Sequence, residues 1–123
     1  MKKIMLVDDD KEFSQELGDS LKINGYNVVT VNDAGEALKT AKHEKPDAIL
    51  LDLKMPKKSG FQVAHELRDS ADIAPIPVIA MSACYKNGDF SIMAVHGIKK
   101  CLSKPFTPER VIKEIESVLN TVR

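Results

Sequence analysis

Apolar residues occur along the chain in two alternating patterns. Most of the short apolar runs lack alternation of apolar and polar positions, which is typical of strands buried on both faces. Between these runs, apolar residues recur every three or four positions, as on one face of a helix. This alternation predicts an α/β fold, with a parallel sheet between two layers of helices and right-handed crossovers. The runs expected to form strands are Ile4–Val7, Tyr26–Val31, Ala48–Leu51, Val78–Met81 and Lys100–Ser103.

Five helices are expected between and after these strands. Asp33, with Glu36 three residues later, forms a capping-box arrangement at one helix start. Thr107 followed by Pro108 suits the start of the last helix. A shorter helical pattern covers Phe90–Val95. The other apolar helix faces are Phe13, Leu17 and Leu21; Ala37, Leu38 and Ala41; Phe61, Ala64 and Leu67; and Val111, Ile112, Ile115, Val118 and Leu119.

Composition narrows the class of protein. The chain has 123 residues, of which 43% are hydrophobic, which suits one domain with one core. Lys plus Arg (18) balances Asp plus Glu (18), which argues against nucleic-acid binding by bulk charge. Ile4–Val7 is far shorter than the ~20 residues that cross a bilayer, and also too short for a secretory signal. We therefore expect a soluble, cytoplasmic protein with neither nucleic acid nor a membrane among its partners.

Four of the expected strands end in polar residues that can do chemistry. Asp8 and Asp9 follow the first strand, Asp52 the third, Ser82 the fourth and Lys104 the fifth. In an open α/β sheet, ligands bind outside the carboxyl ends of the strands, where the strand order reverses. Three carboxylates, a hydroxyl and an ammonium at one sheet edge therefore predict a functional site.

The segments around these positions resemble the receiver domain of bacterial two-component response regulators, in particular single-domain, chemotaxis-regulator-like receivers. The resemblance covers residues 1–123 as one receiver domain. It implies a three-layer, doubly wound, flavodoxin-like fold with five helices and the strand order 2-1-3-4-5. The matching segments are Leu6-Val7-Asp8-Asp9-Asp10, Leu51-Asp52-Leu53-Lys54-Met55-Pro56 with Gly60, Ser82-Ala83 and Lys104-Pro105-Phe106.

The resemblance also implies a function as a phosphorylation-controlled signalling switch. Asp52 would accept a phosphoryl group from a sensor histidine kinase or a histidine phosphotransfer protein. If the chain is complete, output would pass through contacts with an unknown downstream protein or through a phosphorelay. The chain would catalyse only its own phosphorylation and dephosphorylation, so we do not expect a conventional enzyme. A cis peptide bond between Lys104 and Pro105 is a further implication.

Elementary electrostatics points to a metal at this site. Two carboxylates held about 4 Å apart repel by roughly 4 kcal/mol at an effective dielectric constant near 20. Either one of them is protonated or a cation lies between them. Mg²⁺ prefers oxygen ligands and needs only one or two carboxylates. We expect Asp9 and Asp52 to bind Mg²⁺ directly and Asp8 through water, and the resemblance adds the backbone carbonyl of Lys54.

The same residues suit phosphoryl transfer, which depends on positioning and on charge neutralisation. A carboxylate can act as the nucleophile, so Asp52 would attack phosphorus in line. Mg²⁺ and the Lys104 ammonium would stabilise the phosphoryl oxygens, and the Ser82 hydroxyl would donate to one of them.

One residue departs from the usual family pattern. Cys101 stands three residues before Lys104, where the family usually has Tyr or Phe with a ring that reports the phosphorylated state. How phosphorylation is transmitted past this thiol is therefore open. Lys54 and Cys84 occupy positions that commonly tune dephosphorylation, and Lys54 could reach toward the phosphate or into solvent. The cysteines lack the spacing of a zinc site, and a redox-sensing pair of Cys84 and Cys101 is a hypothesis.

Three other functions compete with this interpretation. A degenerate receiver would act as a non-phosphorylated interaction module, but it would not need Asp52, Ser82 and Lys104 together. An aspartyl-phosphate hydrolase would have a second Asp two residues after the nucleophile, where this chain has Lys54. A flavin-binding protein would have a phosphate loop rich in Ser, Thr or Gly after the first strand, where this chain has three aspartates.

Other polar residues have simpler interpretations. Asp10 is expected to cap the helix that follows it. His43, His65 and His96 lack the spacing of metal ligands and are expected to be solvated. Candidate partner faces are residues 57–59 and the surface of the fourth helix and fifth strand.

Overall fold

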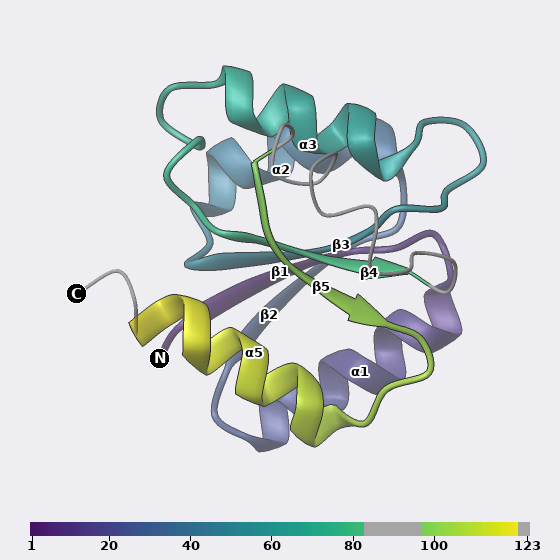
Figure 1. The fold of residues 1–123 in the computed structure, drawn as a ribbon, viewed down its shortest axis with the longest axis vertical. Coiled ribbons are helices and arrows are strands. Elements are labelled where there is room, and N and C mark those ends of the chain that lie inside the picture. The colour runs from purple at the N-terminus through teal and green to yellow at the C-terminus, as the bar shows by residue number, and fades with distance from the viewer. Residues whose placement is uncertain (83–96, 121–123) are drawn as a thin grey trace.

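The fold is a five-stranded parallel sheet between two layers of helices (Figure 1). The computed structural model describes residues 1–82 and 97–120. The strands lie in the order β2-β1-β3-β4-β5, which confirms the predicted doubly wound, flavodoxin-like class. Their bounds are β1 Lys3–Val7, β2 Asn27–Val31, β3 Ala48–Asp52, β4 Val78–Ser82 and β5 Ile98–Ser103.

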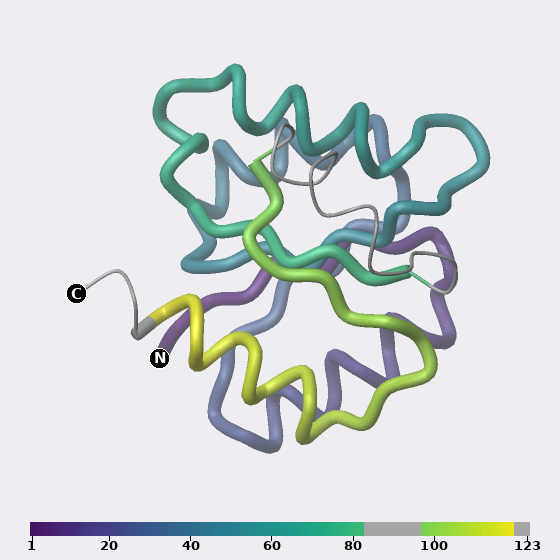
Figure 2. The backbone as a smooth tube through the Cα atoms, in the orientation of Figure 1, coloured from purple at the N-terminus to yellow at the C-terminus, as the bar shows by residue number. Residues whose placement is uncertain are grey.

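The helices cover both faces of the sheet. One face carries α2 (Ala37–Glu44) and α3 (Gly60–Asp69), and the other carries α1 (Lys11–Ile23) and α5 (Pro108–Asn120) (Figure 1). The backbone trace shows α1 and α5 side by side beneath the sheet (Figure 2). Within the described residues, no helix is long and apolar enough to cross a membrane.

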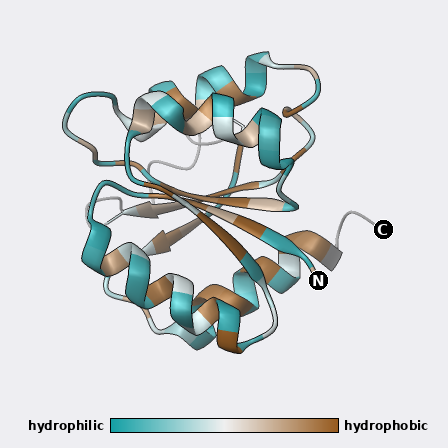
Figure 3. Ribbon diagram, turned by 180° about the vertical axis from the view of Figure 1, so that it is seen from behind, coloured by the Kyte–Doolittle hydropathy of each residue, from teal (hydrophilic) through white to brown (hydrophobic). Residues whose placement is uncertain are grey.

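Burial on both faces explains why the central strands are apolar without alternation. Successive side chains of a strand point to opposite faces of the sheet, so β1 contributes side chains to two separate hydrophobic cores. Met5 and Val7 pack with the α2 and α3 side, whereas Ile4 and Leu6 pack with the α1 and α5 side. In Figure 3, hydrophobic residues (brown) accordingly lie along the sheet and on the sides of the helices that face it.

The predicted strand bounds hold to within one residue except at the start of β5. β5 begins at Ile98 and not at Lys100. It is an edge strand, and its exposed residues Lys99 and Lys100 give no apolar signal. β2 begins at Asn27, because the N–H of Tyr26 donates to the Leu21 carbonyl at the end of α1.

The helix starts also refine the prediction. Asp33 accepts a hydrogen bond from the Gly35 N–H at 2.9 Å, so it caps the short 3₁₀ turn η1 (Ala34–Glu36) that precedes α2. A complete capping box occurs instead at α3, between Ser59 and Gln62. The helix predicted over Phe90–Val95 lies outside the described residues.

Gly60 lets α3 begin directly beside the end of β3. Its N–H donates to the Leu53 carbonyl at 3.1 Å. A Cβ atom at this position would overlap the backbone of Asp52 and Leu53. Glycine is therefore required where the helix approaches the strand end that carries Asp52.

Replacing Gly60 should destabilise the fold, whereas replacing a second glycine should not. Gly60→Ala is expected to lower the free energy of unfolding by about 1–3 kcal/mol, because a backbone contact must open. In Gly18→Ala the new methyl group would lie 3.6 Å from Val28, an ordinary contact. This helical site should gain about 0.5–1 kcal/mol. Urea unfolding of both variants checks the pair, and equal stabilities would contradict the close approach at Gly60.

Candidate functional site

The carboxyl ends of the strands bring the predicted site residues together. Asp8 follows β1 directly, Asp52 ends β3, Ser82 ends β4, and Lys104 follows β5. Because all neighbouring pairs are parallel, these ends share one edge of the sheet. Asp8, Asp52 and Ser82 are 1%, 5% and 1% exposed. Asp9 is exposed, so the cluster opens to solvent on the Asp9 side.

The three aspartates form an oxygen-rich cluster. One carboxylate oxygen from each of Asp8, Asp9 and Asp52 lies within 4.8 Å of the others. Hard divalent cations such as Mg²⁺ take carboxylate oxygens of this kind, with waters completing the shell. The residues present therefore fit the predicted magnesium site. The N–H of Lys54 donates to Asp52 Oδ1 at 3.2 Å, while coordination through the Lys54 carbonyl stays a prediction.

Lys104 also reaches the cluster. Its Nζ atom lies 3.4 Å from Asp8 Oδ2 and 3.8 Å from Asp52 Oδ1. The Lys104 N–H donates to the Ser82 carbonyl at 2.9 Å, which holds the end of β5 against the end of β4. The peptide bond between Lys104 and Pro105 is cis, as predicted.

A network of hydrogen bonds fixes the turn that carries Asp8. Asp8 Oδ1 accepts from the Asp10 N–H at 3.0 Å, and Asp10 Oδ1 accepts from the Phe13 N–H at 3.0 Å. The capping role predicted for Asp10 is thus confirmed. The Ser14 hydroxyl donates to the Asp10 carbonyl at 2.8 Å, and the Asn32 amide donates to the Asp8 carbonyl at 2.8 Å.

Asn32 and Ser14 were not predicted from the sequence. Asn32 directly follows β2, the strand beside β1, so the strand-end criterion extended to all five strands would have found it. Ser14 gives no such signal, because a helical serine is ordinarily a surface residue.

Burial makes the ionised carboxylates unfavourable in the metal-free protein. Burial is the main cause that raises the pKa of Asp52, and repulsion from Asp8 raises it further. Burial likewise raises the pKa of Asp8. In part, a backbone N–H lowers each pKa, that of Asp10 for Asp8 and that of Lys54 for Asp52, and the Lys104 ammonium lowers both. The raised pKa values indicate that a cation would relieve the cluster.

The remaining predicted residues lie away from this cluster or outside the described residues. Cys101 is partly buried in β5, and burial raises the pKa of its thiol. Cys84 lies outside the described residues, so a redox pair stays a hypothesis. His43 and His65 are exposed, as predicted, and His96 also lies outside the described residues.

The raised pKa of Asp52 predicts how stability depends on pH. In metal-free buffer, Asp52→Asn should be more stable than the unchanged chain at neutral pH, because the amide carries no charge into the buried site. A carboxyl group whose pKa is higher in the folded than in the unfolded state stabilises the fold at pH values below its unfolded-state pKa. This stabilisation is lost as the pH rises through its folded-state pKa. The gain in the free energy of unfolding from Asp52→Asn should therefore vanish at acidic pH and grow as the pH rises through the folded-state pKa of Asp52.

Urea unfolding at a series of pH values in EDTA measures this difference. Added Mg²⁺ is the control, since a ligand that binds the folded state stabilises the unchanged chain by mass action. A less stable Asp52→Asn protein at neutral pH in EDTA would contradict the electrostatic interpretation.

Known proteins share both the sequence pattern and the fold. Residues 4–116 match the family model of the response regulator receiver domain. The polar-differentiation response regulator DivK of Brucella anthropi is 33% identical over 118 residues, covering 96% of each chain. The alkaline phosphatase synthesis transcriptional regulatory protein PhoP of Bacillus subtilis is 35% identical over 118 residues. The chain spans about half of PhoP, since the match covers 96% of this chain and 48% of that protein.

Solved structures agree with these relatives. The chemotaxis protein CheY4 of Vibrio cholerae superposes with a TM-score of 0.91 at 29% identity, covering 96% of this chain and 98% of that chain. The receiver domain of the sensor histidine kinase PA1611 from Pseudomonas aeruginosa superposes with a TM-score of 0.87 at 27% identity, covering 97% and 98%. That structure has a magnesium ion coordinated in its active site cleft. With a family match across nearly the whole chain and the strand-end cluster in place, this chain belongs to the response regulator receiver domain family.

Proposed function

We propose that this chain is a phosphorylation-controlled signalling switch that accepts a phosphoryl group on Asp52 with the help of Mg²⁺. The observation that carries the proposal is the buried Asp52 carboxylate, which lies in the oxygen cluster with Asp8 and Asp9 and 3.8 Å from the Lys104 ammonium. A nucleophile, a cation site and a fixed positive charge are thereby combined in one place.

Sheet topology supports Asp52 as the acceptor. β3 lies between β1 and β4, so Asp52 has the other two aspartates on one side and Ser82 on the other. The strand order reverses at β1 and β3, which is where open α/β sheets bind their ligands. Asp9, by contrast, is exposed at the margin of the cluster.

The chemistry then follows from the residues present. A carboxylate oxygen of Asp52 attacks the phosphorus of a donor phosphohistidine, an O–P bond forms and the N–P bond breaks. The electron pair of the broken bond stays on the imidazole nitrogen of the donor. Lys104 and the Ser82 hydroxyl neutralise and orient the phosphoryl oxygens. Bound Mg²⁺, held by Asp8, Asp9 and Asp52 and in the family by the Lys54 carbonyl, would supply further charge neutralisation.

The partners follow from this role. A sensor histidine kinase or a histidine phosphotransfer protein would supply the phosphoryl group, and a downstream protein would bind the phosphorylated form. Hydrolysis of the acyl phosphate would end the signal, so the chain would act only on itself. The similarity to the polar-differentiation response regulator DivK over nearly the whole of both chains supports a signalling role.

Phosphorylation should depend on the buried Asp52 and not on an exposed aspartate. Incubation with Mg²⁺ and acetyl phosphate is expected to add the mass of one phosphoryl group, and Asp52→Asn should abolish the addition. Asp19→Asn, an exposed site in α1, is the matched control and should be modified like the unchanged chain. Intact-mass spectrometry measures all three. An unmodified wild-type chain under every donor would instead favour the degenerate receiver, a pure interaction module.

Removal of the Lys104 charge should slow transfer without removing the metal. Lys104→Met is expected to lower the phosphorylation rate by roughly 10²-fold, the usual effect of losing one positioned transition-state donor. Its Mg²⁺ affinity should not fall, since the variant removes a positive charge 3.4 Å from Asp8. Isothermal titration with Mg²⁺ separates the two effects, and a proportionate loss of both would contradict the assigned role of Lys104.

A further inference from the structure

The Lys104 ammonium lies against an aromatic face as well as against the aspartates. Its Nζ atom is 4.4 Å from the centroid of the Phe13 ring. A cation within about 6 Å of a ring centroid, over its face, is attracted by the ring quadrupole. Lys104 is thus bounded by the Asp8 and Asp52 carboxylates at 3.4 and 3.8 Å and by the Phe13 ring.

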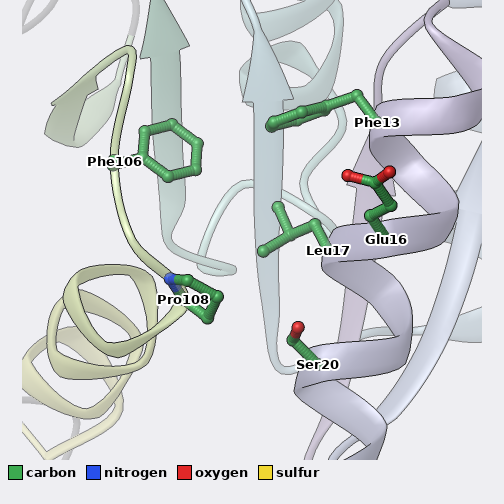
Figure 4. A pocket seen from close by; sticks show the side chains of 6 residues that line it. All are labelled: Phe13, Glu16, Leu17, Ser20, Phe106 and Pro108. Atoms are coloured by element: carbon green, nitrogen blue, oxygen red, sulfur yellow. The ribbon is translucent and has the colours of Figure 1, made fainter.

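The Phe13 ring is itself held in place. The Phe106 ring meets it at a centroid distance of 5.9 Å and an interplanar angle of 70°, an edge-to-face arrangement. Figure 4 shows the two rings across the pocket from each other, Phe13 from α1 and Phe106 from the segment before α5, with Leu17 and Pro108 lining the same pocket. Because Lys104 and Phe106 both belong to the segment between β5 and α5, this segment contacts Phe13 at two points.

We infer that Phe13 is a positioning residue, which holds the Lys104 ammonium where it can meet the transferring phosphoryl group. The inference rests on the proposed function, since it concerns the charge that acts during transfer. A lysine side chain has many rotamers, and their loss on ordering is costly. A fixed ring face removes part of that freedom before the phosphoryl group arrives, as preorganisation requires.

The Asp10 cap links Phe13 to the acidic turn. The Phe13 N–H donates to Asp10 Oδ1, and the Asp10 N–H donates to Asp8 Oδ1. The turn that places Asp8 therefore also places the ring that faces Lys104. The first turn of α1 and the turn before it thus position both the Asp8 carboxylate and the ring that contacts the Lys104 ammonium.

Replacement of the ring should weaken transfer and leave the metal site intact. Phe13→Leu keeps the apolar volume but loses the ring face, so the phosphorylation rate from acetyl phosphate at saturating Mg²⁺ should fall roughly two- to five-fold. Phe13→Tyr keeps the face and should restore the rate. Leu17→Val, one turn along the same helix and in the same pocket, is the control for packing alone and should match the unchanged chain.

A spectroscopic readout distinguishes positioning from packing. Ring current should shift the ε-methylene resonance of Lys104 upfield in the metal-free protein. The shift should disappear in Phe13→Leu and persist in Phe13→Tyr and Leu17→Val, with the Mg²⁺ dissociation constant unchanged in all three.

The outcomes separate this inference from the proposed function. A phosphorylated wild-type chain with a Phe13→Leu variant of equal rate would overturn the role of Phe13 alone. The same holds if the Lys104 resonance does not respond to loss of the ring, or if Leu17→Val slows transfer as much as Phe13→Leu does. A wild-type chain that accepts no phosphoryl group would refute the proposed function, and the role of Phe13 in transfer with it.

Discussion

Two buried carboxylates held side by side are the constraint on which the site depends. Asp8 and Asp52 are almost fully buried, and burial raises the pKa of each. Like charges in such surroundings favour either protonation or a bound cation. The Lys104 ammonium and two backbone N–H groups offset only part of this cost, because the pKa values remain raised. The same imbalance that destabilises the metal-free site makes it suited to a divalent cation.

The rest of the fold serves to hold this arrangement. Each central strand contributes side chains to two hydrophobic cores, one between the sheet and α2 and α3, the other between the sheet and α1 and α5. That burial fixes the register of β1 and β3, so Asp8 and Asp52 cannot move apart without disrupting the sheet. Gly60 allows α3 to begin against the backbone of Asp52, and the Ser82 carbonyl binds the segment that carries Lys104. The unfavourably charged carboxylates are therefore held by buried strands.

Sequence reasoning found those features that depend on local pattern. Strands buried on both faces give apolar runs, and the parallel sheet that they imply places Asp8, Asp52, Ser82 and Lys104 at one edge. Resemblance to a family supplied the strand order and the cis peptide bond. The edge strand β5 begins two residues before its predicted start, because the exposed Lys99 gives no apolar signal after Ile98.

Contacts between distant segments were not predictable in the same way. The approach of Lys104 to the Phe13 ring depends on the path of the segment between β5 and α5, which no periodicity encodes. The position of Asn32 directly after β2 fits the strand-end pattern, but its hydrogen bond to the Asp8 carbonyl has no signal in the sequence. Such contacts arise from side-chain geometry once the backbone is set, so they follow from the structure and not from the pattern of residues.

Reduction of the phosphorylated chain with borohydride tests the central claim most directly. An acyl phosphate on an aspartate is reduced to homoserine, whereas a phosphoester or phosphohistidine is not. After incubation with Mg²⁺ and a phosphoryl donor, peptide mass spectrometry should locate homoserine at position 52 and at no other aspartate. Homoserine at position 8 or 9, or none at all in a chain that carries phosphate, would contradict Asp52 as the acceptor.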